Sequence, residues 1–440
     1  MNRPLLIPPV CILALALVAP RIFGQGGLTP PGPPAPTMKT LAQIEPRAPL
    51  AALPVTLSNA GSYYLTTNLV GVAGQNGITL AADHVTLDLN GFALLGVTGS
   101  LNAIHAPSAR RNIVIRNGTI RGWGQTAVAL TNSEDCVVEQ LHVAANGSGL
   151  LVGNRSAVRL CTVVGNTNVA GIAVGHGAVV QDCVVASNAF RGIVAGDRAR
   201  ITRCTVLANA TGGNDGIAAG LGALVEHCVA AFNGNIGAGT GGGIAVQEGS
   251  TVIGCTTMSN AVEGVFVSFD SVVRDTASRG NGVGISTTGS ARIESCTAAL
   301  NRFLGIWDMG GSLIVNCTAM ENAGPGIVAT NQSIVRGCQA SFNAQEGILI
   351  GAASRAENNH CTFNGAAGLR ALGADNRIEG NLATDNLIGI QVPGSPNLVV
   401  RNQASFNTTN FSVAAGNLFG TVENATSLNT NKNPHANFGF

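Results

Sequence analysis

One six-residue frame recurs through most of the chain and constrains its fold more than any other feature. In Cys161-Thr-Val-Val-Gly-Asn166, a small first residue, here called the slot, is followed five residues later by asparagine. The interval from one frame asparagine to the next, counted from Asn146, is 20 to 27 residues. A period near 21 residues predicts a stack of structural repeats. The slots are Cys161, Cys183, Cys204, Cys228, Cys255, Cys296, Cys317, Cys338, Asn359, Asn381, Asn402 and Asn424.

Each repeat contains three short β-strand patterns and no helical periodicity. In the repeat that ends at Asn188 the apolar segments are 171–174, 178–181 and 183–186, joined by short turns. Segments of about four residues are too short for a strand–helix–strand unit. The sequence therefore predicts an all-β parallel β-helix with about 16 coils of about 21 residues. The slot is expected to point inward at the bend between the second and third strands, and the frame asparagine to mark a turn.

The N-terminal segment has the pattern of an export signal. Arg3 precedes an apolar run over 10–19, which is too short to span a bilayer. We expect this signal to be cleaved, the alternative being an uncleaved N-terminal anchor. The mature protein is then expected to be secreted, to the cell surface, the extracellular medium or the periplasm, without a membrane segment. The expected segments are a signal peptide at 1–24, a Pro-rich leader at 25–54, a cap strand at 55–76, the β-helix at 77–430 and a tail at 431–440.

Composition supports a large folded core and excludes a nucleic-acid partner. Hydrophobic residues make up 45% of the 440 positions, whereas charged residues make up only 11% and the net charge is +1. A chain of this composition is not disordered. It also lacks the basic surface that a polyanion requires.

The cysteines predict buried free thiols rather than a metal centre. Export permits disulfides, but cysteines 21 residues apart stack in register on parallel strands, where bridging is strained. The sequence has no Cys-x-x-Cys pair of the kind that binds zinc, so no metal site is expected. Cys136 and Cys361 lie outside the slot column.

Two strings near the start of the repeats carry a family resemblance. The strings VTLDLNGF at 85–92 and IVIRNGTI at 113–120 resemble the right-handed parallel β-helix repeat proteins of the pectin-lyase-like superfamily. The resemblance covers residues 28–430, and the leader is similar to that of a secreted bacterial subgroup of unassigned activity. It implies a single-stranded right-handed helix. The superfamily includes polysaccharide lyases, hydrolases, epimerases, adhesins and structural fibres, so the fold does not fix the function.

The catalytic motifs of that superfamily are not matched. Of the polygalacturonase-like motifs only Gly175-His176-Gly177 is present, and Arg-Ile-Glu at 292–294 and 377–379 stands where those enzymes have Arg-Ile-Lys. We interpret His176 as a turn residue. The Trp-Ile-Asp-His stretch of pectate lyases is missing, and Asn433-Pro434-His435 only partly matches the Asp-Pro-His of alginate epimerases. Whether the chain is an enzyme stays open.

The candidate site lies on the outward side of the first strand of the repeat. Phe266 and Trp307 fall in one predicted outward column, two rungs or about 10 Å apart, a spacing that suits two stacked sugar rings. Gly-rich insertions at 210–214 and 234–242 are expected to form a rim beside them. The alternative is that these are scattered exposed aromatics beside solvated acids. The carboxylates predicted at the edge, as an acid–base pair or as calcium ligands, are Glu248, Glu263, Asp270 and Asp308.

Three hypotheses about function follow. The leading one is a secreted β-helix that binds or scaffolds extracellular polysaccharide, without a catalytic motif and without a required cofactor. The second is a polysaccharide lyase or glycoside hydrolase that acts on a glycan containing uronic acid, with calcium as its candidate cofactor. The third is a structural surface fibre or adhesin, since apolar outward columns also suit a homo-oligomer.

Overall fold

The computed structural model describes residues 44–209, 212–424, 426–427 and 433–440. The chain divides into two units, Met1–Pro46 and Arg47–Phe440. The predicted export signal at 1–24 and the leader up to residue 43 lie outside the described residues. Among the described residues, no helix has the length and hydropathy needed to cross a bilayer.

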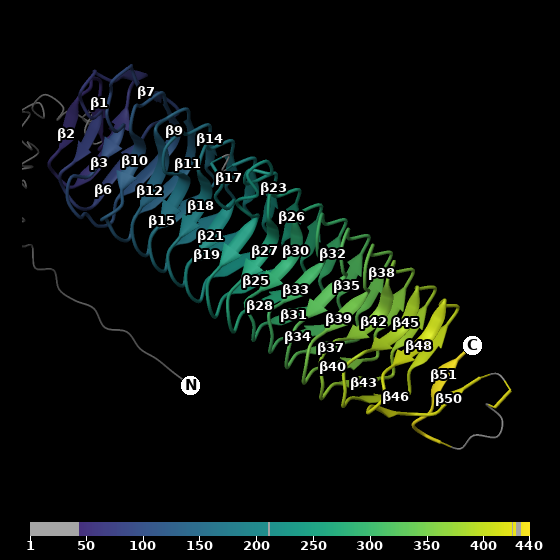
Figure 1. The fold of residues 1–440 in the computed structure, drawn as a ribbon. Coiled ribbons are helices and arrows are strands. Elements are labelled where there is room, and N and C mark those ends of the chain that lie inside the picture. Colours follow the sequence, from purple (N-terminus) through teal and green to yellow (C-terminus); the bar gives the residue numbers. More distant parts are fainter. Residues whose placement is uncertain (1–43, 210–211, 425, 428–432) are drawn as a thin grey trace, which may run out of the picture. The chain divides into compact units, whose positions relative to one another are not determined.

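The second unit is a stack of short parallel strands wound coil upon coil around three faces (Figure 1). This confirms the predicted all-β parallel β-helix. Face 1 has 17 strands, close to the predicted 16 coils. They are β2 (Val55–Leu57), β5 (Ile78–Leu80), β8 (Ile104–His105), β10 (Thr126–Leu130), β12 (Ser148–Val152), β15 (Ala170–Val174), β18 (Arg191–Ala195), β21 (Ile217–Ala219), β24 (Ile244–Val246), β27 (Glu263–Val267), β30 (Val283–Thr287), β33 (Ile306–Asp308), β36 (Ile327–Ala329), β39 (Ile348–Ile350), β42 (Ala367–Ala371), β45 (Ile388–Val392) and β48 (Thr409–Val413).

Face 2 follows face 1 in every coil. Its strands are β1 (Ala48–Leu50), β3 (Gly61–Leu65), β6 (Val85–Asp88), β9 (Val114–Arg121), β11 (Val137–Ala144), β13 (Ala157–Arg159), β16 (Val179–Gln181), β19 (Arg200–Thr202), β22 (Leu224–Glu226), β25 (Thr251–Ile253), β28 (Val272–Arg274), β31 (Arg292–Glu294), β34 (Leu313–Val315), β37 (Ile334–Arg336), β40 (Arg355–Glu357), β43 (Arg377–Glu379), β46 (Leu398–Val400) and β49 (Leu418–Phe419).

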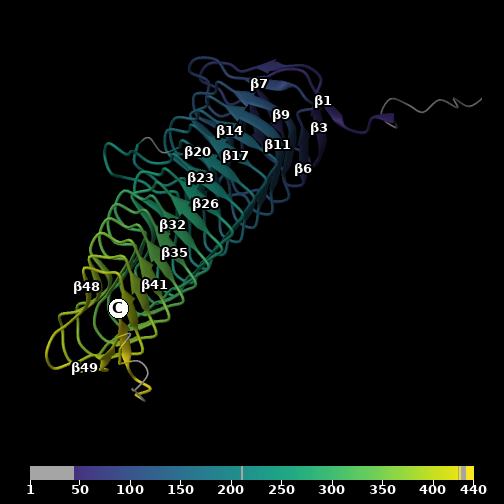
Figure 2. The same ribbon diagram turned by 90° about the vertical axis from the view of Figure 1, so that its right-hand side faces the viewer.

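Face 3 completes the coil and is turned toward the viewer in Figure 2. The long strands β9 and β11 bend from face 2 onto face 3 and join the two ladders. Its other strands are β4 (Leu69–Val70), β7 (Ala93–Leu95), β14 (Thr162–Val164), β17 (Val184–Ala186), β20 (Thr205–Leu207), β23 (Val229–Ala231), β26 (Thr256–Met258), β29 (Ala277–Arg279), β32 (Thr297–Ala299), β35 (Thr318–Met320), β38 (Gln339–Ser341), β41 (His360–Thr362), β44 (Leu382–Thr384), β47 (Gln403–Ser405), β50 (Val422–Glu423) and β51 (Asn437–Gly439).

The first coil starts before residue 77. Strands β2, β3 and β4 place the segment 55–70 on all three faces, and each pairs in parallel with the following coil. Leu57 and Leu65 point into the core and are buried. The segment predicted as a cap strand thus follows the path of a full coil.

In most coils each face contributes at least one buried apolar side chain to the interior, with Thr257 and Ser278 as polar exceptions on face 3. In the coil of Asn188 these are Ile172, Val180 and Val185, all fully buried. Because side chains alternate along a strand, their neighbours Ala173, Val179 and Val184 point outward.

The slot residues line the corner between faces 2 and 3 and are buried, as predicted. All ten cysteines of the described chain are buried and unpaired. The thiol of Cys317 donates to the carbonyl oxygen of Val315 at 3.3 Å. Burial raises the pKa of the Cys361 thiol, which keeps it neutral inside the coil.

The frame asparagines form a buried amide ladder at the corner between faces 3 and 1, which is more than the turn marker predicted. The backbone N–H and the amide Nδ2 of Asn301 both donate to Oδ1 of Asn322, at 3.0 and 2.9 Å. Asn322 repeats these bonds to Asn343. Because each amide meets an identical amide one rung away, the ladder satisfies the polar groups at a corner where the sheets end.

The prediction that Asn424 is the last slot residue is wrong. Asn437 occupies this position, because its Oδ1 accepts hydrogen bonds from the backbone N–H and the Nδ2 of Asn402 at 2.9 and 3.1 Å. Strand β51 stacks on β47, and β50 stacks on β51 in turn. Asn424 instead accepts hydrogen bonds from Thr426 within its own turn. The chain leaves the regular period here and returns with the same residue type, while the frame partner Asn429 lies outside the described residues.

Candidate functional site

The outward side of face 1 places the two predicted aromatic residues in one column. In the parallel register Phe266 lies beside Ser286, and Ser286 lies beside Trp307. Phe266 and Trp307 are therefore two rungs apart, as the sequence pattern predicts, and both rings are partly exposed. Their role in binding stays a prediction.

The residue between the rings is covered. Ser286 occupies an outward position, yet only 2% of it is exposed. Its hydroxyl has no hydrogen-bond partner among the described residues. Phe266 and Trp307 thus flank a small residue in their column, which makes a continuous apolar strip across three rungs.

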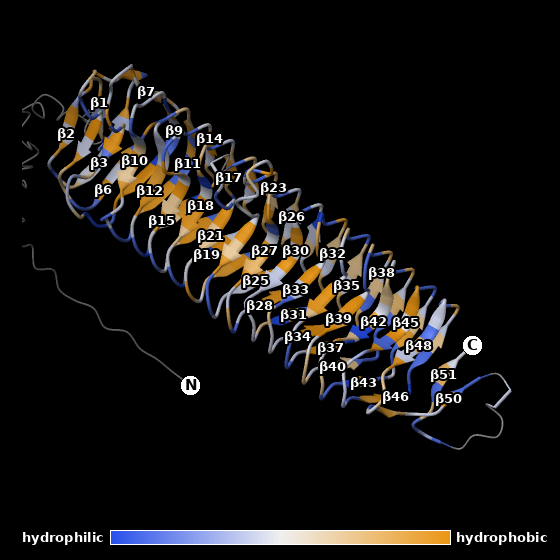
Figure 3. Ribbon diagram, in the orientation of Figure 1, coloured by the Kyte–Doolittle hydropathy of each residue, from blue (hydrophilic) through white to orange (hydrophobic). Residues whose placement is uncertain are grey.

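A shallow hollow continues this strip toward the C-terminal coils. The volume of this hollow is about 330 Å³. The groove at the C-terminal end of face 2, described below, has a volume of about 410 Å³. Val328, the register neighbour of Trp307, and Leu349 on the next rung line the hollow. Leu372, which is 48% exposed, forms its edge. The strip and the hollow together offer an apolar surface from Phe266 to Leu349. Figure 3 shows that face-1 strands such as β15, β21 and β27 are rich in hydrophobic residues.

The four predicted carboxylates do not form one cluster. Glu263 begins β27, whereas the exposed Glu248 and Asp270 lie in turns after strands of face 1. Among the described residues, no group of three or more His, Cys, Asp or Glu side chains could hold a metal ion. A shared role for the four acids therefore has no geometric basis in this part of the chain.

Asp308 corrects the sequence-based prediction most clearly, because it points into the core. It is fully buried, and the hydroxyls of Ser312 and Ser333 donate to its two oxygens at 2.6 Å each. The backbone N–H of Gly310 donates to Oδ1 at 3.0 Å. Since Trp307 points outward, the alternation along β33 directs the next residue inward. Asp308 is thus a structural carboxylate.

Glu263 has a neighbour that the sequence analysis missed. Asp215 precedes the face-1 strand two coils earlier, and its Oδ1 accepts a hydrogen bond from the backbone N–H of Gly242 at 2.8 Å. A side chain at Gly242 would meet Asp215 Oδ1 at 3.4 Å and the backbone oxygen of Glu263 at 2.9 Å. Burial raises the pKa of Glu263, and the charge of Asp215 raises it further. Acidic residues directly before the strand glycine in both coils were the available signal.

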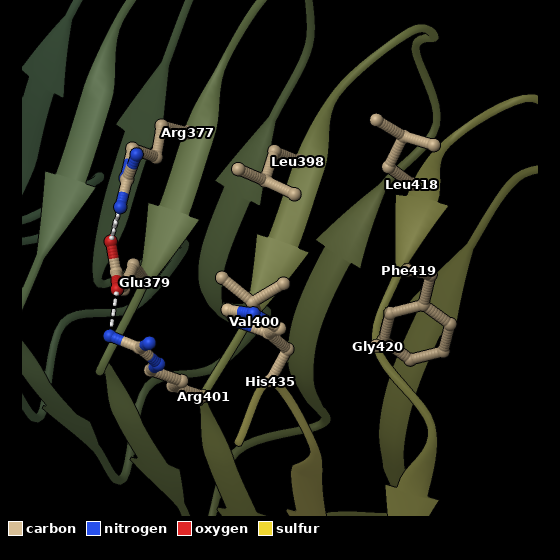
Figure 4. Close-up of a pocket in the computed structure, with 9 residues that line it drawn as sticks. All are labelled: Arg377, Glu379, Leu398, Val400, Arg401, Leu418, Phe419, Gly420 and His435. Atoms are coloured by element: carbon tan, nitrogen blue, oxygen red, sulfur yellow. Dashed lines mark hydrogen bonds and ion pairs between the residues drawn. The ribbon is translucent and has the colours of Figure 1, made fainter. Parts of the chain in front are cut away.

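The largest difference from the sequence prediction is a groove at the C-terminal end of face 2 (Figure 4). It is lined by Leu398, Val400, Leu418 and Phe419, with Arg377, Glu379, Arg401, Gly420 and His435 completing it. Arg377 Nε and a terminal nitrogen of Arg401 donate to the two oxygens of Glu379, at 2.6 and 2.9 Å. One carboxylate thus holds two guanidinium groups, which leaves one positive charge beside an apolar floor. Such a groove suits an anionic group on an otherwise apolar ligand.

Two sequence motifs are explained by their place in the fold. His176 lies in the turn between β15 and β16, where its Nδ1 accepts a hydrogen bond from the backbone N–H of Asp197 at 3.0 Å. This supports its interpretation as a turn residue. Asn433-Pro434-His435 lies beside the groove, and the carbonyl oxygen of Pro434 accepts a hydrogen bond from Arg401 Nε at 3.0 Å.

Comparison with solved structures finds matches at low sequence identity. An A-module of a mannuronan C-5 epimerase from Azotobacter vinelandii is 14% identical, with 81% of this chain and 91% of that chain covered and a TM-score of 0.35. A periplasmic alginate epimerase is 11% identical, covering 74% and 75%, with a TM-score of 0.40. The Dettilon tailspike protein is 15% identical, covering 74% and 62%, with a TM-score of 0.34. A search of curated proteins finds no significant match.

The family comparison is decisive for the fold. The profile of the right-handed β-helix region matches three overlapping segments, 55–211, 110–275 and 231–373. Together they cover well over half of the chain and coincide with the stacked coils. The chain therefore belongs to the right-handed β-helix family.

Proposed function

We propose that the chain binds an extended polysaccharide along face 1, with Phe266 and Trp307 as stacking rings and the hollow at Val328 and Leu349 as the adjoining subsite. The observation that carries this proposal is the register, which puts the two rings and the hollow in one line along the stack. A sugar presents apolar C–H faces, which pack well against aromatic rings. The strip is long enough for several sugar units side by side.

The charge of face 1 supports an uncharged stretch of glycan on this strip. The eleven outward positions from β10 to β39 hold only Ala, Leu, Val, Phe, Ser and Trp. The next position in the column is Arg370, whose charge is balanced by Glu346 at 2.9 Å. A chain of hydroxyl-bearing sugars thus meets apolar and neutral side chains along the whole strip.

The proposed setting is outside the cytoplasm, where the predicted export signal would deliver the protein. A regular stack of coils can scaffold a long polymer as well as bind a short one. This proposal favours binding over the fibre or adhesin reading because the aromatic column is local, whereas a fibre would use the whole length of the stack.

Binding to a panel of neutral and uronic-acid oligosaccharides, measured by isothermal titration calorimetry, tests the proposal. The purified protein should bind at least one neutral glycan, and Trp307→Ala should weaken that binding. Val194→Ala is the matched control, because Val194 lies in the same outward column five coils before Trp307 and should leave binding unchanged. Equal affinity of Trp307→Ala and the wild type, or no binding to any glycan, would refute the proposal.

Cleavage of a polysaccharide is the second candidate function, favoured by one specific observation. The half-buried Glu263, whose pKa is raised by burial and by the charge of Asp215, begins the strand that carries Phe266, and Gly242 lies between its backbone and the Asp215 carboxylate. A carboxyl group that keeps its proton can act as a general acid while a second carboxylate acts as a base. The same glycan panel should then be followed for new reducing ends and for unsaturated-uronate absorbance, with and without calcium. Product that Glu263→Gln abolishes would establish cleavage, and binding without product would exclude it for the glycans tested.

A further inference from the structure

The motif Arg-Ile-Glu occurs twice on face 2, in β31 and in β43, and the second copy lines the C-terminal groove. In both copies the arginine Nε donates to a carboxylate oxygen of the glutamate, at 2.9 Å from Arg292 to Glu294 and at 2.6 Å from Arg377 to Glu379. In both copies the next coil places a leucine beside the arginine and a valine beside the glutamate. The upstream copy is therefore an internal reference for the copy in the groove.

The two copies differ first in charge. The residue directly before the slot in the next coil is Asn316 upstream and Arg401 downstream, and both have a left-handed backbone. Arg401 donates from one terminal nitrogen to Glu379 at 2.9 Å and from Nε to the carbonyl oxygen of Pro434 at 3.0 Å. The upstream arginine and glutamate are a neutral pair, whereas two guanidinium groups share one carboxylate in the groove (Figure 4). These three side chains carry one net positive charge.

The hydrogen bonds of the groove hold both guanidinium groups in place and leave donors available. Arg377 and Arg401 each retain one terminal nitrogen without a hydrogen bond to any residue that the structure describes. About half of each side chain is exposed. An arginine already held by its neighbours loses less conformational freedom when it binds a ligand. The two groups therefore form a preorganised site for an anionic oxygen group.

The two copies differ also in the coil that follows. Upstream, Arg336 lies beside the valine of that copy. Downstream, the strand β49 ends at Phe419, and Gly420 follows it without a side chain. Leu418 and Phe419 are 70% and 37% exposed, which is unusual for side chains of this size. The groove of about 410 Å³ thus combines a cationic side with an apolar side, and its volume is in the range of small-molecule sites.

We infer that this groove binds a small amphipathic anion. The negatively charged head bonds to Arg377 and Arg401, and the apolar body packs on Leu418 and Phe419. A single negative charge suits the site, because a phosphate monoester carries about −1.5 to −2 charges against the one positive charge of the three side chains. A carboxylate on an aliphatic chain has the required chemistry. Other charged residues of these coils line adjoining hollows; they are Arg355, Glu357 and Asp375.

Isothermal titration calorimetry with octanoate tests the inference. Octanoate should bind one-to-one, and 1-octanol should bind at least about ten times more weakly, because its neutral head makes weaker hydrogen bonds to the two arginines. Affinity should rise up to about fourfold for each CH₂ group added from butanoate to octanoate, as the added groups are buried on the apolar side. Absence of octanoate binding below its micelle concentration, or equal binding of 1-octanol, would overturn the inference.

Arg401→Asn converts the groove copy of the motif into the upstream copy. Asparagine is favoured in a left-handed backbone, so the variant should remain folded, with an unchanged circular dichroism spectrum. Its affinity for octanoate should fall at least about tenfold, while its affinity for 1-octanol should stay the same. Arg292→Gln is the matched control, because Arg292 makes the same ion pair outside the groove and should leave octanoate binding unchanged. Equal losses in both variants, or no loss in Arg401→Asn, would contradict the assigned head site.

Two further measurements separate this groove from the glycan strip. The groove lies on face 2, so Trp307→Ala on face 1 should leave octanoate binding unchanged. A loss in that variant would place octanoate on the face-1 strip and overturn the inference. Glucuronate has the charged head without the apolar body, and it should bind more weakly than octanoate. Glucuronate binding as tight as that of octanoate would assign the groove to acidic sugars and overturn the role of Leu418 and Phe419.

Discussion

The buried asparagine ladder and the outward column of face 1 have the same period but opposite degrees of uniformity. From Asn146 to Asn407 the ladder position holds asparagine in every coil, whereas the column on face 1 holds alanine, valine, leucine, serine, phenylalanine, tryptophan and arginine. Inside, each residue must bond to an identical residue above and below it. Outside, only the backbone has to match, so the side chain is free to serve contacts with other molecules.

This difference indicates which residues of a repetitive fold serve architecture and which serve function. A residue that repeats in every coil, such as the ladder asparagine, carries the architecture. A residue that departs from its column, such as Trp307 on face 1, has no architectural need. Four substitutions test this contrast, and the first should have the strongest effect.

Asn343→Ala should destabilise the protein by about 3 kcal/mol. The substitution removes the acceptor of the backbone N–H and Nδ2 of Asn322 and the donor to the carbonyl oxygen of Ala319, and each buried group left unpaired costs about 1–3 kcal/mol. Urea unfolding followed by circular dichroism measures the change. The exposed neighbour Gln345→Ala is the control and should stay close to the wild type; an equal loss in both variants would contradict the role of the ladder.

Substitutions at Cys338 test whether the slot cysteine serves packing rather than thiol reactivity. Its backbone N–H already donates to Oδ1 of Asn359 at 2.9 Å, at the end of the asparagine part of the slot column. Cys338→Asn extends that ladder and should change the free energy of unfolding by less than about 1 kcal/mol, whereas the larger Cys338→Leu should cost about 2 kcal/mol through overpacking. If unfolding experiments showed the Asn variant to be the less stable of the two, the interchange of Cys and Asn in the slot would need another explanation.

Trp307→Ala should reduce affinity for the bound glycan about tenfold, or about 1.4 kcal/mol, because one aromatic contact contributes on this scale. Trp307→Phe should recover most of this loss, since Phe retains a stacking ring. Stability should change little in either variant, because Trp307 is only partly buried. Calorimetric titration of the three proteins measures the effect, and a Phe variant as weak as the Ala variant would argue against stacking.

Glu263→Gln should have the smallest effect, and one that depends on pH. Burial raises the pKa of Glu263 above its ordinary value of 4.5, so the folded state binds this proton more tightly than the unfolded state. The wild type therefore loses stability as the pH rises from about 4.5 through the folded-state pKa, while the Gln variant does not. Unfolding temperatures at a series of pH values should match at low pH and favour the Gln variant at neutral pH. A gap that narrows as the pH rises would reverse the assigned direction of the pKa.

The sequence was sufficient for the fold and for the register of face 1, because both follow from the spacing of the frame. That spacing places Phe266 and Trp307 in one column and the slot cysteines in the core. The inward direction of Asp308 was also available from the alternation along its strand, but its proximity to Trp307 in sequence suggested a shared surface instead.

Other features depend on contacts that spacing does not encode. Asp215 and Glu263 lie on either side of Gly242, which ends one of two insertions of unequal length, and residues 210–211 of the other insertion lie outside the described residues. Asn437 replaces Asn424 because β51, and not β50, stacks on β47. The groove beside Glu379 forms where apolar residues replace charged ones on the last coils of face 2, which a search for single motifs does not detect.

Binding along face 1 predicts a specific dependence of affinity on oligosaccharide length. The strip from Phe266 to Leu349 covers four rung steps, or about 19 Å. Calorimetric titration with neutral oligosaccharides of increasing length should show affinity that rises until the ligand spans the strip and then levels off, with a smaller rise in Trp307→Ala. An affinity that does not change with length, or the same rise in both proteins, would contradict binding along face 1.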